Sequence, residues 1–407
     1  MSSKVKGGTD GAHRQPDGNR EIYMDNAATS YPKPAVVEEA LMDYHRNLGA
    51  SAGRGAYPRA VQTGRLLDHT RKLLASLFNV GNPNQIIFSF NTSDALNLAI
   101  KGIDWHAGDS VIVSAMEHNS ILRPLHALKN RKGIKVVRIK ANAEGVIDPA
   151  DVAAAVDSHT KLIALVHGSN VTGTLEPVAE VGDIARRSGI PFLVDAAQTA
   201  GALPIDVEAM KVDLLAFPGH KALMGPLGTG ALYIREGIDL DTMREGGTGS
   251  LSEHDVQPDF LPDRYEAGSH NALGIAGWKA ALEFVHEQGV DAIRAHEEKL
   301  MEQFLAGASH IKHLTVFGPR DIRRRIAVFS VRLDEYAPQE LSHRLFEGAG
   351  LMTRSGLHCA PGAHQTLETY PLGTTRLSFG YFNTPDHVDQ ALAALDRLSK
   401  NPIIAIR

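Results

Sequence analysis

The sequence is poor in cysteine, because its 407 residues include only Cys359. A single thiol excludes an intramolecular disulfide and any metal site built from several thiolates. Cys359 is therefore either a buried structural residue or a nucleophile. Residues 355–362 have the composition of a mobile loop, whereas a structural cysteine usually lies in an apolar run. The sequence favours the nucleophile.

An excess of basic residues is also missing, since 42 Lys and Arg oppose 47 Asp and Glu for a net charge of -5. This balance excludes the basic surface that nucleic-acid binding requires. The apolar runs are far shorter than the ~20 residues of a membrane span. Residues 1–20 are polar and lack an apolar signal core, which predicts a flexible tail. We expect a cytoplasmic protein with no nucleic acid and no membrane as partners.

Several familiar site motifs are absent or out of context. No G-x-G-x-x-G follows a predicted strand, and residues 219–222 are not a Walker loop, so nicotinamide and nucleoside triphosphate sites lose their support. Residues 49–53 match the hydrolase motif G-x-S-x-G, but a helical pattern precedes them where that motif needs a strand. His358, Cys359 and His364 lack a second thiol, and H-E-x-x-H is missing. We predict no metal site.

The chain is longer than a single hydrophobic core usually supports, so two domains are expected. Strand and helix patterns alternate from about residue 85 to residue 234, which is typical of an α/β fold with a mainly parallel sheet. We predict a tail at 1–20, a large α/β domain at 21–285 and a small α+β domain at 286–407. The small domain carries the Cys359 loop, and the first folded residues can pack on it.

The central feature is an acid followed by a lysine at the ends of two successive strands. The apolar run from Ile190 ends in Asp195, and the next strand leads to Lys221. Open α/β proteins bind ligands at the carboxyl edge of the sheet. A pyridoxal phosphate (PLP) site needs an anion beside the pyridine nitrogen and an amine for the Schiff base. A helix cap at Asp195 and a surface charge at Lys221 are the ordinary alternatives.

A second feature is the hydroxyl pair Thr92 and Ser93, between a predicted strand at 85–90 and a helix expected to begin near Ala95. Free backbone donors and the positive end of a helix dipole make such a junction a suitable phosphate-binding site. A plain helix cap has the same local pattern.

Nine segments in order resemble the class V aminotransferase-fold family of PLP enzymes, within it the cysteine desulfurase and selenocysteine lyase branch. The resemblance implies the PLP-dependent transferase fold type I, with a mainly parallel seven-stranded sheet. The matching segments lie at 25–28, 91–95, 116–119, 169–173, 195–198, 219–221, 266–269, 354–359 and 375–378.

The resemblance implies roles around the cofactor. Lys221 would hold PLP and move the proton at Cα as a catalytic residue, and Asp195 would pair with the pyridinium nitrogen. His118 would stack on the ring, as a cofactor-binding and catalytic residue. Asn170 and Gln198 would hydrogen-bond the phenolic oxygen.

It also implies a phosphate site and a dimer. Thr92, Ser93 and His220 would donate to the phosphate, and Ser269 would reach across from a second subunit of a homodimer. Pro218 departs from the family pattern, because a serine or threonine there would add a donor that proline lacks.

The substrate side of the site follows from the same resemblance. Arg376 would bind the α-carboxylate, with Asn170 and Arg354 also at the substrate. The thiolate of Cys359, the third catalytic residue, would attack the substrate sulfur, leaving a persulfide and releasing alanine. His358 and His364 are candidates for adjusting the protonation of the thiol or of the leaving group.

The sequence therefore predicts a PLP-dependent cysteine desulfurase that converts L-cysteine to L-alanine and passes sulfur to an acceptor protein, as in iron–sulfur cluster assembly. Selenocysteine lyase, cysteine sulfinate desulfinase and other PLP lyases or epimerases of this fold stay open, because elimination of a good leaving group does not require Cys359. A PLP-fold binding scaffold is disfavoured by the intact pair Lys221 and Asp195.

Overall fold

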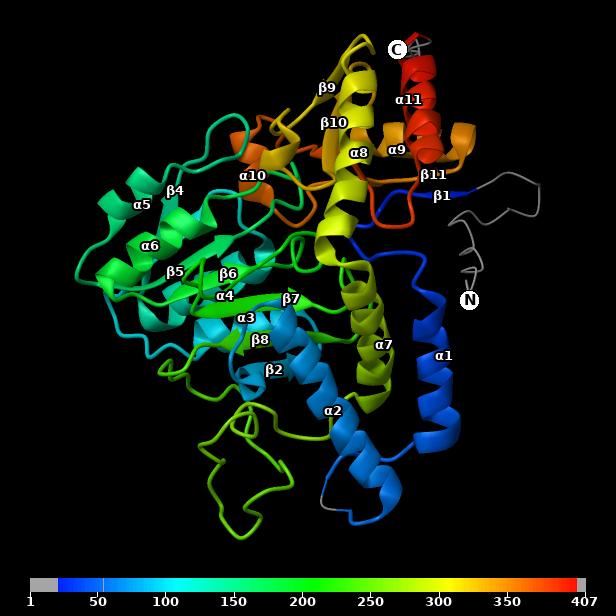
Figure 1. The fold of residues 1–407 in the computed structure, drawn as a ribbon. Coiled ribbons are helices and arrows are strands. Elements are labelled where there is room, and N and C mark those ends of the chain that lie inside the picture. The colour runs from blue at the N-terminus through cyan, green and yellow to red at the C-terminus, as the bar shows by residue number, and fades with distance from the viewer. Residues whose placement is uncertain (1–20, 54, 401–407) are drawn as a thin grey trace.

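The computed structural model describes residues 21–53 and 55–400 of the chain. At its centre lies a seven-stranded sheet (Figure 1). In spatial order, its strands are β2 (Ile86–Ser89), β8 (Gly230–Ile234), β7 (Leu214–Pro218), β6 (Phe192–Asp195), β5 (Thr160–Val166), β3 (Ser110–Ser114) and β4 (Lys135–Ile139). Only β8 runs antiparallel to its neighbours. The predicted α/β fold with a mainly parallel sheet is confirmed.

Helices cover both faces of this sheet, as the apolar runs of its strands require. They are α1 (Ala35–Asp43), α2 (Pro58–Leu77), α3 (Thr92–Lys101), α4 (Asn119–Lys132), α5 (Pro149–Ala155), α6 (Val178–Ser188) and α7 (Ala272–Gln288), with short helices at Tyr44–Leu48 and Pro83–Gln85. One hydrophobic cluster gathers residues of α2, α6 and α7 against the sheet, and another gathers residues of α3 and α4. The two clusters hold the sheet between two helical layers.

A third hydrophobic cluster belongs mainly to the C-terminal part of the chain. Its elements are α8 (Val290–Ala308), β9 (Leu314–Val316), a short helix at Ile322–Arg324, β10 (Val328–Leu333), α9 (Pro338–Ala349), β11 (Leu351–Met352), β12 (Arg354–Gly356), α10 (Pro361–Thr366), β13 (Thr374–Ser378) and α11 (Pro385–Lys400). Strands β12, β13, β10 and β9 form an antiparallel sheet in that order.

The first described residues lie with this C-terminal part. Strand β1 (Ile22–Tyr23) pairs with β11, so that Ile22 stands opposite Leu351. The domain limits at 21–285 and 286–407 stay predictions, and the predicted tail at 1–20 lies outside the described residues. No helix between residues 21 and 400, residue 54 apart, combines the length and apolarity that crossing a membrane demands.

Two local predictions can be compared with the structure. Helix α3 begins at Thr92 and not near Ala95, because the Asn91 side chain caps it by accepting a hydrogen bond from the Asp94 amide at 3.0 Å. The hydroxyl pair therefore belongs to the first turn of the helix. Before the G-x-S-x-G motif lie α1 and a short π-helix that ends at Leu48, so the strand of a nucleophile elbow is missing.

Candidate active site

A cavity of about 230 Å³ lies at the carboxyl end of the large sheet, where segments of the C-terminal part meet it. It brings together eleven of the twelve predicted site residues. They are Thr92, Ser93, His118, Asn170, Asp195, Gln198, His220, Lys221, Arg354, Cys359 and Arg376. Ser269 is the exception, since it lines a separate cavity.

Asp195 lies at the end of β6, and Lys221 follows the end of β7, the parallel strand next to it. Asp195 is the last residue of β6 and is 2% exposed, and its Oδ1 accepts a hydrogen bond from the Ala197 amide at 2.9 Å. Burial raises the pKa of Asp195, while the nearby Lys221 lowers it. Burial also lowers the pKa of Lys221 to about 8, against the opposing effect of Asp195. The site therefore pairs a buried carboxyl with an amine that loses its proton unusually easily.

This pKa leads to a test on the cofactor-free protein. Reductive methylation by formaldehyde requires the neutral amine, so we expect the rate at Lys221 to rise with a midpoint near pH 8, whereas an ordinary lysine has a pKa of 10.5. In Asp195→Asn the midpoint should move lower, because an anion that favours the ammonium is lost. Peptide mass spectrometry at several pH values measures both. A Lys221 midpoint equal to that of exposed Lys129 would contradict the assignment.

The first turn of α3 forms one end of the cavity. Thr92 and Ser93 are its first two residues, where backbone amides have no intrahelical acceptor and the helix dipole is positive. Ser93 Oγ lies 2.6 Å from Ser120 Oγ, and Ser120 also lines the cavity. Buried Nδ1 of His220 has no hydrogen-bond partner among the described residues. These groups suit an anion such as phosphate.

His118 caps helix α4 with its own ring. Its Nδ1 accepts a hydrogen bond from the Ser120 amide at 3.1 Å, so the proton of the neutral ring lies on Nε2. Burial, together with the charge of Lys221, lowers the pKa of His118 to about 4. The ring is thus neutral at pH 7 and can face a flat cofactor. Ser120 was not predicted as a site residue, although a serine two residues after His118 is consistent with the start of a helix.

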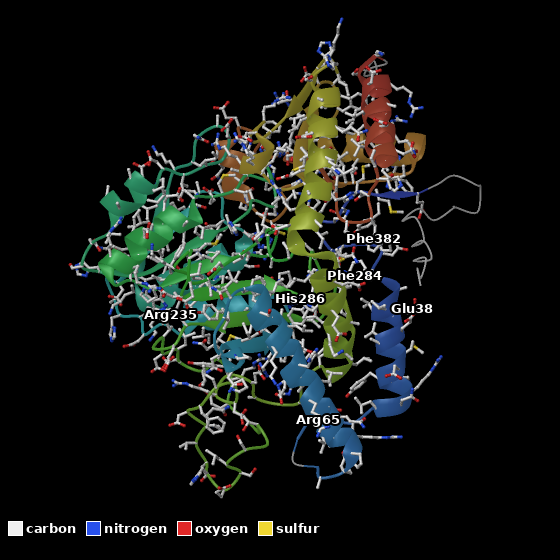
Figure 2. All side chains as sticks on the ribbon, viewed as in Figure 1. Glu38, Arg65, Arg235, Phe284, His286 and Phe382 are labelled. Atoms are coloured by element: carbon white, nitrogen blue, oxygen red, sulfur yellow. The ribbon has the colours of Figure 1, made fainter. Side chains whose placement is uncertain are left out.

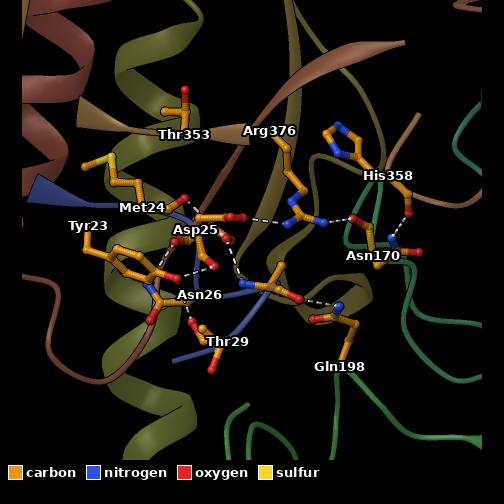
Figure 3. Close-up of polar contacts among 12 residues, drawn as sticks. Tyr23, Met24, Asp25, Asn26, Thr29, Asn170, Gln198, Thr353, His358 and Arg376 are labelled. Atoms are coloured by element: carbon orange, nitrogen blue, oxygen red, sulfur yellow. Dashed lines mark hydrogen bonds and ion pairs between the residues drawn. The ribbon is translucent and has the colours of Figure 1, made fainter. Parts of the chain in front are cut away.

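Arg376 is held by two contacts that the sequence did not reveal (Figure 3). Its guanidinium is 1% exposed, with Nη2 2.6 Å from Asp25 Oδ1 and Nη1 donating to the Asn170 carbonyl at 3.1 Å. Its buried Nε has no partner among the described residues. Arg354 stands opposite Arg376 in the β12–β13 register, so both side chains share one face at the cavity. Two cations next to each other suit a carboxylate.

Asp25 should therefore matter although it does not line the cavity. In Asp25→Asn, the buried guanidinium of Arg376 loses its counter-charge. Removal of one partner from a buried ion pair costs roughly 3–5 kcal/mol, and we expect about 2 kcal/mol here because the Asp25 carboxylate is 21% exposed. Urea unfolding of the cofactor-free variant measures the loss. Unchanged stability would show that Arg376 does not depend on Asp25.

The two amide side chains are already partly engaged. Gln198 Nε2 donates to the Ala27 carbonyl at 3.0 Å, and Asn170 Nδ2 donates to the His358 carbonyl at 2.7 Å (Figure 3). Each amide retains a second N–H and its oxygen for the cavity. Their predicted contact with a phenolic oxygen stays a prediction.

Cys359 is exposed and lies in a turn of four residues between β12 and α10. The expected loop is thus short, and its backbone is hydrogen-bonded. Burial lowers the pKa of His358 to about 2 and that of His364 to about 4. Both rings are therefore neutral near pH 7. Their role in adjusting the protonation of the thiol or of the leaving group stays a prediction. Within residues 21–53 and 55–400, no three His, Cys, Asp or Glu side chains gather as a metal site.

Ser269 belongs to a segment that is firmly anchored elsewhere. The buried carboxylate of Glu266 accepts hydrogen bonds from Arg71, and His270 Nε2 lies 2.6 Å from Glu266 Oε2. Ser269 lines a cavity with Phe90 and Arg244. A second subunit would be needed to bring Ser269 to the phosphate end, so this predicted role stays a prediction.

The Aminotransferase class-V family model matches residues 22–391 of the chain. The chain belongs to the class-V aminotransferase family. Among curated members, it is 35% identical to a probable cysteine desulfurase of Methanothermobacter thermautotrophicus, covering 93% of this chain and 94% of that one. It is 31% identical to a cysteine desulfurase of Serratia proteamaculans, covering 95% of both chains.

Solved members of the class-V aminotransferase family have the same fold. A cysteine desulfurase of Thermococcus onnurineus superposes with a TM-score of 0.87 at 32% identity, over 93% of this chain and 95% of that one. One of Escherichia coli gives a TM-score of 0.84 at 26% identity, over 94% and 96%. The family predicted from the sequence, its cysteine desulfurase branch and the fold are thereby confirmed.

The cavity residues fit PLP on their own chemistry. Buried Asp195 accepts only the Ala197 amide among the described residues, which leaves capacity for a ring N–H. Lys221 offers an amine, and the α3 terminus with the unpartnered His220 Nδ1 offers donors for a phosphate. One cavity thus contains a carboxylate, an amine and a set of donors for a phosphate, which are the three groups that this cofactor requires.

Proposed function

We propose that the protein is a PLP-dependent cysteine desulfurase that converts L-cysteine to L-alanine and retains the sulfur as a persulfide on Cys359. The observation that supports it most is the exposed thiol of Cys359 at the cavity that Lys221, Asp195 and Arg376 also line. Bound PLP would supply a sink for the electrons released at Cα.

Substrate binding, proton transfer and pairing with the cofactor would be carried out by different residues. Arg376, with Arg354 beside it, would bind the α-carboxylate and orient the amino acid. Lys221, with its lowered pKa, would take the proton from Cα as a neutral amine and return it later. Asp195 would remain anionic next to the cofactor's ring nitrogen.

Sulfur transfer would occur at Cys359. Its thiolate would attack the substrate sulfur, forming an S–S bond while the Cβ–S bond breaks and its electron pair passes to Cβ. Protonation at that carbon would give alanine, and the sulfur would remain as Cys359 persulfide. A lyase that expels selenide or sulfite would not require this thiol.

Single-turnover product analysis tests the proposal. The PLP-loaded protein is mixed with L-cysteine without reductant, and alanine and the mass of the peptide with Cys359 are followed. We expect stoichiometric alanine and a mass gain of one sulfur atom. If the absorbance shows that cysteine reacts with the cofactor but neither product forms, the desulfurase proposal fails, and selenocysteine, cysteine sulfinate and racemisation assays decide between the lyase and epimerase alternatives.

We further propose a cytoplasmic homodimer that hands its persulfide to an acceptor protein for iron–sulfur cluster assembly. The anchored segment of Ser269, separate from the cavity of its own chain, supports the dimer. Sedimentation of the holoenzyme tests it, since a fully active monomer would contradict a shared site. Loss of the persulfide mass on addition of a candidate acceptor tests the transfer.

A further inference from the structure

The turn that carries the nucleophile has an unusual backbone. His358 has a φ of 48° and Cys359 a φ of 58°, both in the left-handed region that favours glycine. Among the described residues, they are the only two consecutive non-glycine residues with positive φ. Such strain persists only where the surroundings hold it, and it gathers at functional sites.

Hydrogen bonds hold the backbone of the turn on both sides. The His358 carbonyl accepts from Asn170 Nδ2 at 2.7 Å, and the Cys359 carbonyl accepts from the Asn119 amide at 2.7 Å (Figure 3 shows the first). The Ala360 amide closes the turn by donating to the Leu357 carbonyl at 2.9 Å. The backbone on either side of the thiol is thus tied to the loop after β5 and to the first residue of α4.

The ring of His358 is held mainly by packing. It is 4% exposed and lies against the ring of His364, with centroids 5.7 Å apart. Its Nδ1 has no partner among the described residues, and its Nε2 is 3.4 Å from Thr374 Oγ1, which already donates to Ser330. The ring is therefore held next to the turn by burial and packing more than by hydrogen bonds.

We propose that His358 is a positioning residue, whose buried ring fixes the left-handed turn and thereby holds the Cys359 thiol at the cavity. This inference rests on the proposed function for its effect on sulfur transfer. Its structural part, the anchoring of the turn, is independent of that function.

Two substitutions separate anchoring from ring chemistry. Asparagine tolerates left-handed φ but lacks the ring, so His358→Asn should loosen the turn. Phenylalanine keeps a ring of similar size without nitrogens, so His358→Phe should restore the turn. The matched control is His313→Asn, because His313 also has a positive φ, of 64°, but its side chain is 64% exposed.

Three readouts are compared on the PLP-loaded variants: alanine formed from L-cysteine, exchange of the Cα proton of L-alanine, which does not need the thiol, and hydrogen exchange of peptides 357–360. In His358→Asn we expect faster amide exchange in the turn and desulfuration lowered about 100-fold, since misplacing a reacting group by ~1 Å costs on that order. Cα-proton exchange should stay within twofold of the wild type. His358→Phe should recover most of the desulfuration.

Several results would overturn the inference. Wild-type desulfuration or an unchanged turn in His358→Asn would do so, as would a His358→Phe variant with a protected turn but no sulfur transfer, which would point to the ring nitrogens. If the asparagine variant does not fold, the phenylalanine variant still decides, because a protected turn without sulfur transfer contradicts the inference. If the wild type forms no persulfide, the proposed function fails, yet the amide exchange still shows whether the ring anchors the turn.

Discussion

Replacement of Cys359 by serine is expected to reduce alanine formation from L-cysteine to background. A serine hydroxyl is not ionised near neutral pH and attacks sulfur poorly, whereas a thiolate is the reactive form in sulfur exchange. Because Cys359 is the only cysteine of the chain, no other thiol can replace it. The rate of alanine release in the presence of a reductant measures the effect.

The control for this variant is a reaction that does not use the thiol. Cys359→Ser should still bind PLP and should still exchange the Cα proton of L-alanine, because Lys221, Asp195 and Arg376 are intact. Full desulfuration by the serine variant would refute the proposed function. Undiminished activity on selenocysteine, with loss on cysteine, would instead place the enzyme nearer to the lyases.

The second large effect is expected for Lys221→Ala, which should lower alanine formation and Cα-proton exchange together by roughly 100- to 10,000-fold or more, the usual contribution of a general acid–base group. The two activities fall in parallel because the proton at Cα is the target of Lys221 in both. Deuterium exchange of L-alanine, followed by NMR, and alanine release from cysteine measure them.

Partial recovery with added methylamine or ethylamine would support the role of an amine base in Lys221→Ala. Lys129→Ala on the exposed side of α4 is the matched control and should keep wild-type rates. A Lys221 variant that loses desulfuration but keeps Cα-proton exchange would contradict the assignment, because the base would then lie elsewhere.

The environment of the two variants explains why their effects should differ in kind. Lys221 and buried Asp195 lie at the end of the large sheet, whereas Cys359 reaches the same cavity on a turn of the C-terminal part. Figure 2 shows how densely side chains fill the region around the ribbon where these parts meet. In the proposed mechanism, loss of the Cys359 thiol removes sulfur transfer and spares Cα-proton exchange, whereas loss of Lys221 removes both.

Much of the large sheet could be predicted from the sequence, because buried parallel strands are apolar runs and their helices show a helical period. The strand Lys135–Ile139 and the helix entered at Asp148 and Pro149 are found as predicted. The start of α3 was misplaced, because the capping bond from the Asp94 amide to Asn91 is a local geometry that the apolar pattern does not report.

The sequence by itself determined the kind of chemistry available: one thiol, an acid and a lysine at successive strand ends, and motifs in family order. Only the tertiary structure decided how these groups are held. Asp25 and Arg376 are 351 residues apart and form an ion pair, and Asn170 reaches the carbonyl of His358, 188 residues away. Such contacts depend on how separate elements pack, and a linear pattern records only periodicity and local turns. The same packing buried His358 and His364 near Cys359 and thereby lowered the pKa of both rings.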